Sequence, residues 1–185
     1  VGEYPTNTKF QELVRRVVER GGVVGGSSAG MAAMPQVMTL WEDRRALTAP
    51  AVAVTAHGFG LLTKAVVEQH FDVRGGRLER FFNFLRDSER LDELTGRPGA
   101  GEEMVGLAVE EHTAVIAQQD SLNVVGQGKA HVFLKTQAGR SINWQELRPG
   151  ETARLKRDAA NERREEIVLV HEADHAAANA TASSE

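Results

Sequence analysis

A serine between small residues is the first feature of this sequence that could perform chemistry. Residues 21–34 read GGVVGGSSAGMAAM, and residues 26–30 fit the pattern G-x-S-x-G with Ser28 at its centre. In that pattern the serine occupies a tight turn between a strand and a helix, with its hydroxyl exposed. The turn would also direct the N–H of Ala29 toward a developing oxyanion. An ordinary Gly/Ser turn or a phosphate-binding turn would fit the same residues.

A serine hydroxyl needs a base to accept its proton and a carboxylate to orient that base. His70 follows the apolar residues 65–67, where the pattern predicts the end of a strand, and strand ends line the crevices of α/β sheets. In GLAVEEHTAVI, residues 106–116, Glu110 and Glu111 interrupt an apolar stretch. Because side chains alternate along a strand, only one of these two carboxylates is expected to face the histidine.

The elements predicted around Ser28 follow the order helix, strand, glycine-rich turn, helix. Residues 8–20 carry apolar side chains at helical spacing and end at two glycines, and the valines at 23–24 fit a short buried strand of a parallel sheet. A further helix is expected from about residue 77 to 94, with charges opposite its apolar side. This order predicts an α/β fold. The apolar side of the last helix is formed by Leu78, Phe81, Phe82 and Leu85.

After residue 103 the sequence changes to short β-branched runs, which are typical of strands. Residues 92–103 form an acidic Gly/Pro-containing loop before them, and residues 171–185 are predicted to be a disordered tail because they lack apolar residues to pack. We therefore expect residues 1–170 to be the C-terminal major part of a single α/β hydrolase domain. The predicted strands lie within residues 104–110, 113–117, 122–125, 130–135 and 166–170.

Three sequence blocks, in this order, resemble the cyanophycinase branch of the serine peptidases that also include dipeptidase E. GGSSAGM, EQHFDVRGGRLERF and GLAVEEHTAV are similar to the GxSAGA, DQHFxxRxR and GIxIDExTA blocks of that family. The interval of 42 residues between Ser28 and His70 also suits the family. The resemblance implies a fold similar to the class I glutamine amidotransferase domain: a flavodoxin-like parallel sheet with flanking helices, here with additional C-terminal strands.

The resemblance also implies roles for individual residues. It places the family's nucleophile on Ser28, its base on His70 and its carboxylate on Glu111, with Glu110 as the alternative to Glu111. The N–H of Ala29 would contribute to the oxyanion hole, and no cofactor or metal is required.

Further residues are implied to bind the substrate. Gln69 and Thr113 match polar residues that line the family's site, and Glu68 stands where cyanophycinases usually have aspartate. Arg74 matches the first arginine after the histidine, whereas Arg77 and Arg80 are shifted by one position through an extra glycine. A carboxylate near Glu68 would suit guanidinium groups and the arginines would suit carboxylates. A solvated helix face is the alternative interpretation of the three arginines.

The function implied by the resemblance is cleavage of aspartate-linked peptides, with release of β-aspartyl-arginine units from a polyaspartate-type substrate. An aspartyl dipeptidase or exopeptidase of the same family is one alternative, and a non-catalytic binding protein on the same scaffold is another. The net charge of −4 argues against nucleic acid as a partner, and no apolar run is long enough to cross a membrane. The chain has no cysteine, which leaves the redox compartment open. The compartment is not determined by the sequence, and a cytoplasmic location is favoured over a secreted one.

Two further features remain. The stretch HEADH, residues 171–175, fits the zinc pattern H-E-x-x-H but lacks a third ligand and a packed helix, so no metal site is expected. Nothing in residues 1–8 resembles the glycine-rich loop that supplies the family's second oxyanion donor. The 185 residues are therefore expected to be the C-terminal part of a longer polypeptide or one of two associated chains, and a homodimer is a further option.

Overall fold

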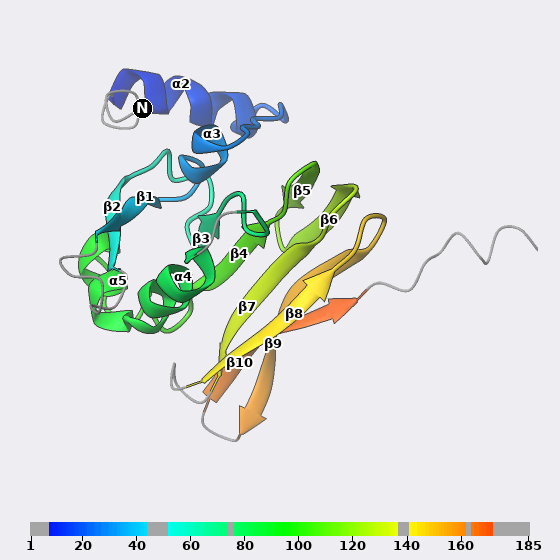
Figure 1. Cartoon of the computed structure of the whole chain (residues 1–185). Coiled ribbons are helices and arrows are strands. Elements are labelled where there is room, and N and C mark those ends of the chain that lie inside the picture. The colour runs from blue at the N-terminus through cyan, green and yellow to red at the C-terminus, as the bar shows by residue number, and fades with distance from the viewer. Residues whose placement is uncertain (1–7, 44–51, 74–75, 137–140, 162–163, 172–185) are drawn as a thin grey trace, which may run out of the picture.

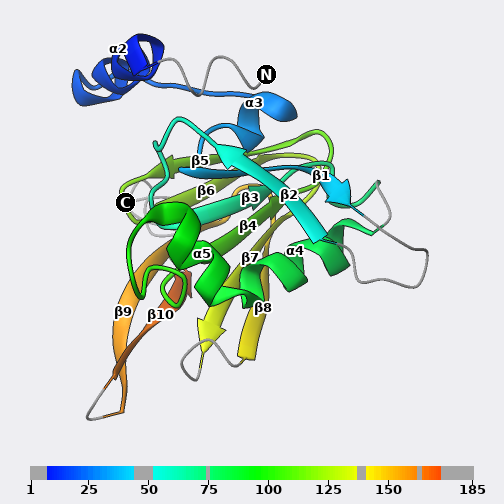
Figure 2. The same ribbon diagram turned by 90° about the vertical axis from the view of Figure 1, so that its left-hand side faces the viewer.

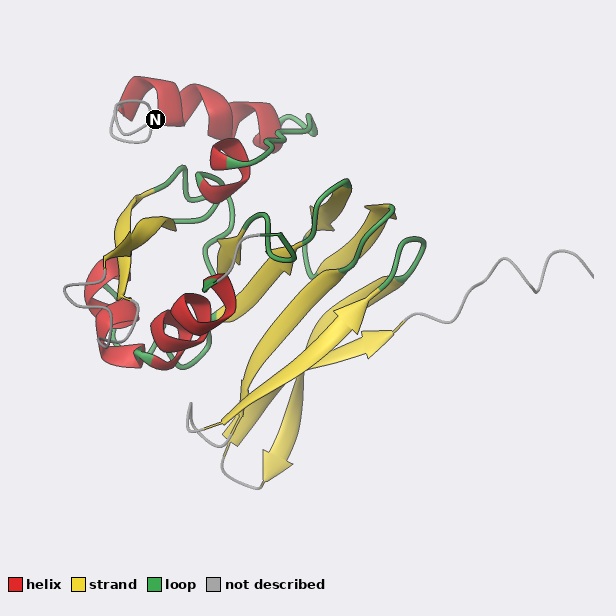
Figure 3. Ribbon diagram, in the orientation of Figure 1, coloured by secondary structure: helices red, strands yellow, loops and turns green. Residues whose placement is uncertain are grey.

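The computed structural model describes residues 8–43, 52–73, 76–136, 141–161 and 164–171. Figures 1 and 3 show helices near the N-terminal half and strands dominating the C-terminal half. The helices are α2 (Thr8–Glu19), α3 (Ala29–Ala32), α4 (Arg77–Arg86) and α5 (Ser88–Thr95). The strands are β1 (Val37–Asp43), β2 (Val52–His57), β3 (Ala65–Glu68), β4 (Val105–Val109), β5 (Thr113–Gln118), β6 (Ser121–Gly126), β7 (Ala130–Thr136), β8 (Ser141–Leu147), β9 (Thr152–Asn161) and β10 (Arg164–His171).

The described strands form three sheets, so the α/β class is confirmed but the sheets are mixed. One sheet has the order β3-β4-β7-β8, a second has the order β10-β9-β6-β5, and β1 pairs with β2. Only β3 and β4 pair in parallel, with Ala65 opposite Val105, whereas the other strand pairs are antiparallel. The predicted parallel sheet is therefore present among the described residues only as this one pair, because hairpin connections join most of the remaining strands.

The sheet β3-β4-β7-β8 is covered on both faces. Figure 2 shows α4 and α5 on one side of it, and the sheet β10-β9-β6-β5 lies on the other. Strands β4 and β7 are buried almost throughout because both of their faces pack against apolar layers. Side-chain alternation divides the strand residues between the layers. The layer between the sheets includes Val67, Leu107, Val109, Val124, Val132 and Leu134, and the layer under the helices includes Val66, Phe81, Leu85, Ala108 and Phe133.

The helix predicted from 77 to 94 is two helices in the structure. The chain leaves helical geometry at Asp87, with φ −81° and ψ 77°, and the carboxylate of Asp87 accepts a hydrogen bond from the backbone N of Arg90. Asp87 therefore ends α4 and caps the start of α5. The buried face of α4 also differs from the predicted one, because Leu78 is exposed. The buried face consists of Arg77, Arg80, Phe81, Phe84 and Leu85.

The N-terminal helix forms as predicted, but the strand predicted after it does not. Helix α2 contacts the rest of the described chain through Phe10, whose ring lies 5.6 Å from that of Phe59, and through Arg15, whose Nε donates to the Phe59 carbonyl. Residues 22–26 have no regular secondary structure, and Val23 is 90% exposed. A two-residue apolar run becomes a buried strand only beside a neighbouring strand, and none of the described strands pairs with it.

Some strands lie where the sequence pattern did not predict them. Strands β1 and β2 pair with each other, β8 is an edge strand beside β7, and β9 lies between β10 and β6. The sequences of β8 (SINWQEL) and β9 (TARLKRDAAN) are polar or highly charged, so their apolar alternation is weak. These strands are therefore determined by their partners more than by their own composition.

Among the described helices, none is long and apolar enough to cross a membrane.

A buried lysine joins β7 to the segment that follows α5. Lys135 is 6% exposed, and its Nζ donates to the Ser88 hydroxyl and, at 2.6 Å, to the Gly101 carbonyl. The same segment is held by Asp92, whose carboxylate accepts from the N–H groups of Gly99 and Gly101. Burial lowers the pKa of Lys135 to about 8, and the N–H groups of Gly101 and Gly99 lower the pKa of Asp92.

We expect Lys135 to make the protein less stable below pH 8 than above it. An unfolded lysine binds its proton up to about pH 10.5, whereas the folded one releases it near pH 8, so the free energy of unfolding rises across this window. The full effect is at most about 3 kcal/mol. Urea denaturation of wild type and Lys135→Met between pH 7 and 10.5 measures it. Equal slopes of stability against pH in the two proteins would contradict the prediction.

Candidate active site

Ser28 lies at the turn into α3 in a conformation that few non-glycine residues adopt. Its φ is 52° and its ψ is −121°, and the residue is exposed. Gly26 makes this turn possible, because a Cβ on Gly26 would lie 2.5 Å from the backbone carbon of Gly30. Such strained backbone at an exposed polar residue is typical of functional sites. The turn is therefore tight at Ser28, and residues 23–24 before it are not a strand.

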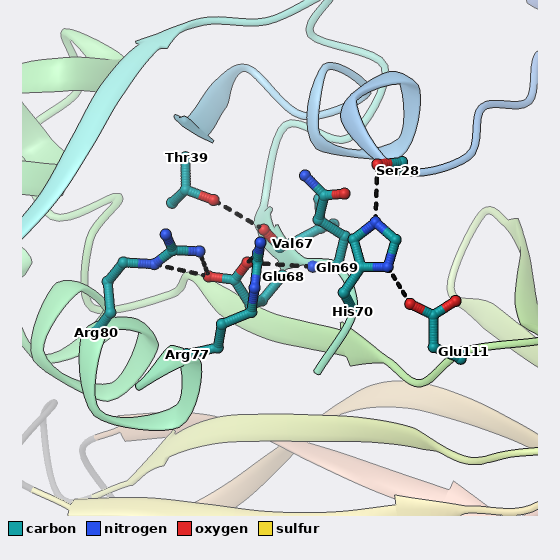
Figure 4. A network of polar contacts seen from close by, with 9 residues as sticks. All are labelled: Ser28, Thr39, Val67, Glu68, Gln69, His70, Arg77, Arg80 and Glu111. Carbon is teal, nitrogen blue, oxygen red and sulfur yellow. Dashed lines mark hydrogen bonds and ion pairs between the residues drawn. The ribbon is translucent and has the colours of Figure 1, made fainter. Parts of the chain in front are cut away.

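His70 lies just beyond the C-terminal end of β3 and contacts Ser28. Its Nε2 is 2.8 Å from the Ser28 Oγ, and its Nδ1 contacts Oε1 of Glu111 (Figure 4). A carboxylate only accepts hydrogen bonds, so Nδ1 is the nitrogen that donates, and Nε2 is left to accept the serine proton. The imidazole is partly buried, with 19% of the side chain exposed, and 34% of the Glu111 side chain is exposed.

Glu110 and Glu111 contact different histidines. Both residues follow the end of β4 and precede β5, so the turn between these strands, and not alternation along a strand, separates their side chains. The Glu110 carboxylate accepts from the backbone N of Lys129 at 2.7 Å and lies 2.9 Å from Nε2 of His131. His131 is buried in β7, and its Nδ1 accepts from the Trp144 indole. Glu110 therefore contributes to the packing of β7, and Glu111 is the carboxylate on His70.

Glu68 forms a buried ionic cluster with two arginines of α4. Its side chain is 0% exposed, and those of Arg77 and Arg80 are 10% and 5% exposed. Arg77 Nη1 donates to one carboxylate oxygen, and Arg80 donates to the other through Nη2 and through Nε, the latter at 3.1 Å. Figure 4 shows this cluster beside the segment that carries His70.

This cluster corrects one interpretation of the sequence, the solvated helix face. Arg77 and Arg80 do not form a solvated helix face, because a buried carboxylate attracts them to the packed side of α4. Glu68 and Arg77, expected to bind substrate, direct their charged atoms toward each other. Their contact with a substrate stays a prediction.

The remaining predicted residues have different surroundings. Gln69 is next to His70, and its buried Oε1 has no hydrogen-bond partner among the described residues. The Thr113 hydroxyl donates to the Glu111 carbonyl at 2.9 Å and accepts from Gly128 N, so Thr113 holds the turn of Glu111. Ala29 begins α3, and none of the hydrogen bonds between described residues uses its N–H. Arg74 lies outside the described residues.

Sequence reasoning did not identify Asp72, whose carboxylate accepts from the backbone N of Glu111 at 2.9 Å. Its place two residues after His70 is the only signal in the sequence. The part of the chain that the structure describes holds no group of three His, Cys, Asp or Glu side chains suited to a metal ion. Of the zinc-like stretch 171–175, His171 ends β10 and the other residues lie outside the described ranges.

Comparison with curated proteins confirms the resemblance that the three blocks predict. A cyanophycinase of Geminocystis herdmanii is 29% identical over 124 residues, which cover 66% of this chain and 40% of that protein. Cyanophycinases of Trichormus variabilis and of a Nostoc species are each 26% identical over 135 residues, covering 71% of this chain and 40% of theirs. No family model matches the chain. The chain is thus cyanophycinase-like in sequence, and its match spans about two fifths of these relatives.

Removing the Glu68 carboxylate is expected to destabilise the protein strongly. Glu68→Ala leaves two buried guanidinium groups without their counter-charge, which costs about 3–5 kcal/mol of unfolding free energy. Glu68→Gln keeps one acceptor oxygen and is expected to cost less. Denaturant titration measures both losses, with the exposed Glu12→Ala as the control. A loss below about 1 kcal/mol for Glu68→Ala would show that the cluster is not structural.

The Ser28→Gly variant is expected to be more stable than Ser28→Ala, although alanine is usually the more stabilising of the two residues. Both substitutions remove the contact with His70, but only glycine relieves the strain at φ 52°, by about 1 kcal/mol. Thermal unfolding of Ser28→Gly and Ser28→Ala tests this difference. The same pair at Ser141 in β8, where φ is not positive, is the control and should show alanine as the more stable. If alanine gave the more stable variant at both positions, this would argue against backbone strain at Ser28.

Proposed function

We propose that this chain carries the catalytic groups of a serine-type peptidase that cleaves aspartate-linked peptides, as its likeness to cyanophycinases suggests. The observation that carries the proposal is the continuous contact from Ser28 Oγ through His70 to Glu111. These residues come from three separate segments, and their order of contact is that of nucleophile, base and orienting carboxylate.

In the proposed reaction, Ser28 Oγ forms a bond to the scissile carbonyl carbon while His70 Nε2 takes the hydroxyl proton. The carbonyl oxygen becomes an oxyanion, toward which Ala29 N–H is available as one donor. When the intermediate collapses, the carbon–nitrogen bond breaks and His70 returns the proton to the leaving amine. A water then attacks the acyl-enzyme by the same route. Glu111 stabilises the imidazolium and holds its orientation throughout.

The proposal includes parts that lie beyond the described contacts. A tetrahedral oxyanion generally takes a second donor, and we assign it to another segment of polypeptide or to a partner chain, as the sequence comparison with the family suggests. A homodimer is one form that such a partner could take. The flavodoxin-like fold of the relatives is likewise proposed for the complete domain, with the parallel pair β3 and β4 in support.

Substrate recognition is proposed for the polar residues around His70. Gln69 is proposed to contact the substrate because it adjoins His70 and matches a polar residue of the family's site, and its Oε1 has no hydrogen-bond partner among the described residues. Arg74 is proposed to bind a substrate carboxylate, and the Glu68 cluster to support the backbone that presents Gln69 and His70. We propose a peptide or polyaspartate-type substrate and no cofactor.

A fluorophosphonate probe tests the serine assignment. It is expected to label wild type and not Ser28→Ala, because only an activated hydroxyl attacks the phosphorus. Absence of labelling on folded wild type would favour a binding protein on the same scaffold. Digestion of cyanophycin beside a panel of α- and β-aspartyl dipeptides then separates a polymer-cleaving enzyme from a dipeptidase.

Kinetic coupling tests whether Ser28 and His70 act as a unit. Ser28→Ala and His70→Ala are each expected to lower kcat by at least ~10³, and the double variant by little more than either one. Losses that multiply would contradict a shared step.

The two glutamates provide a matched pair of variants. Glu111→Gln is expected to lower turnover strongly, whereas Glu110→Gln, which acts on Lys129 and His131, should change mainly stability. Initial rates and denaturant midpoints of both variants check this. A reversed pattern would transfer the carboxylate role to Glu110.

A further inference from the structure

Glu111 lies on a turn, so something other than a strand ladder must hold its carboxylate against His70. The turn begins after β4 ends at Val109 and continues until β5 starts at Thr113. Residues in turns are less rigidly held than residues in sheets. Catalytic groups must nevertheless stay within a fraction of an ångström of their productive positions. The hydrogen bonds of the Glu111 peptide groups are therefore decisive.

Two contacts, besides that of Glu111 with His70 itself, join the Glu111 turn directly to the segment that carries His70. The backbone N of Phe71 donates to the Val109 carbonyl at 3.2 Å, and the backbone N of Glu111 donates to Oδ1 of Asp72 at 2.9 Å. The first contact uses main chain only and is available to any residue at position 71. The second depends on a particular side chain.

The other side of the turn is held independently of Asp72. The Thr113 hydroxyl donates to the Glu111 carbonyl, and Gly128 N donates to that hydroxyl at 2.8 Å. A Cβ on Gly128 would lie 2.7 Å from the Thr113 Oγ1, so this contact is close. Thr113 ties the turn to the β6–β7 connection, whereas Asp72 ties the Glu111 backbone to the His70 segment.

The His70 segment is itself anchored at Phe71. The Phe71 ring lies 4.9 Å from the His131 ring and 6.0 Å from the Phe133 ring, both on β7. This aromatic packing fixes the residue between His70 and Asp72. The backbone before Asp72 is thereby held in place, although Asp72 itself is exposed.

We propose that Asp72 is a positioning residue that sets the distance between Glu111 and His70. It does so by accepting the Glu111 N–H, which places the Glu111 side chain beside the imidazole Nδ1. The role of this contact in catalysis rests on the proposed peptidase function, whereas the contact itself can be tested without any turnover. Among the described residues, the only other side-chain hydrogen bond between the two segments is the one from His70 to Glu111 itself.

The first test measures the geometry directly by NMR on the whole chain. Asp72→Ala removes the acceptor, so hydrogen exchange of the Glu111 amide should accelerate about tenfold or more. The low-field imidazole proton resonance of His70, which reports its contact with Glu111, should broaden or disappear. Asp72→Asn keeps an acceptor oxygen at the same length and should restore both signals. Asp120→Ala, in the exposed β5–β6 turn, is the control and should leave them unchanged.

An unchanged Glu111 amide and His70 resonance in Asp72→Ala would overturn the proposal. If Asp72→Ala does not fold, Asp72→Glu provides the same test, because it keeps the charge but moves the acceptor by one methylene. The proposal is supported if Asp72→Glu speeds exchange of the Glu111 amide and loses the His70 resonance, while Asp72→Asn keeps slow exchange and the resonance. Equal exchange rates and equal His70 resonances in Asp72→Glu and Asp72→Asn would overturn the proposal.

The second test is kinetic and separates this proposal from the proposed function. With a cleavable aspartyl peptide, Asp72→Ala should lower kcat about tenfold with little change in KM, and Asp72→Asn should recover most of the rate. A rise in KM alone would overturn positioning in favour of substrate contact. If wild type neither cleaves peptides nor reacts with a fluorophosphonate, the peptidase function fails, while the NMR result still decides whether Asp72 holds Glu111 against His70.

Discussion

The buried carboxylate of Glu68 determines how a large part of this structure is arranged. A fully buried charge is tolerated only when it is paired, and here two guanidinium groups from one helix supply the pairing. Arg77 and Arg80 lie three residues apart, so both face the same side of α4. Their pairing fixes which face of α4 packs against β3 and β4. It also fixes the start of the connection from β3 to α4, which contains Gln69, His70, Phe71 and Asp72.

Backbone strain is concentrated where the polar side chains meet. Among the described non-glycine residues, positive φ occurs at Ser28, His70, His112 and Gln119. The first two contact each other, and the third follows Glu111 directly. Each of these conformations costs free energy that the surrounding packing must offset. The two layers on either side of the β3-β4-β7-β8 sheet supply that packing, and the site lies at the ends of its strands.

The sequence allowed the cyanophycinase resemblance, the first helix and most C-terminal strands to be predicted, because each is a local pattern. The tight turn at Ser28 could be predicted because glycine at position 26 is required by a close backbone contact. The buried face of α4 could not be predicted, because periodicity alone assigns its arginines to solvent. It does not show that Glu68, nine residues before Arg77, is buried. The mixed sheets were missed for a related reason. A short apolar run indicates a strand but does not indicate the direction of its neighbour.

The two neighbouring glutamates of the β4–β5 turn connect the candidate site to a tryptophan, whose fluorescence can report on it. Glu111 contacts the partly buried imidazole of His70, and Glu110 contacts the buried imidazole of His131, which in turn accepts from the indole N–H of Trp144. Indole emission is sensitive to the polarity and hydrogen bonding of that N–H. Any displacement of the turn that carries Glu111 also moves Glu110 and disturbs this chain of contacts. The fluorescence of Trp144 therefore gives a signal for movement at the turn without a label at the turn itself.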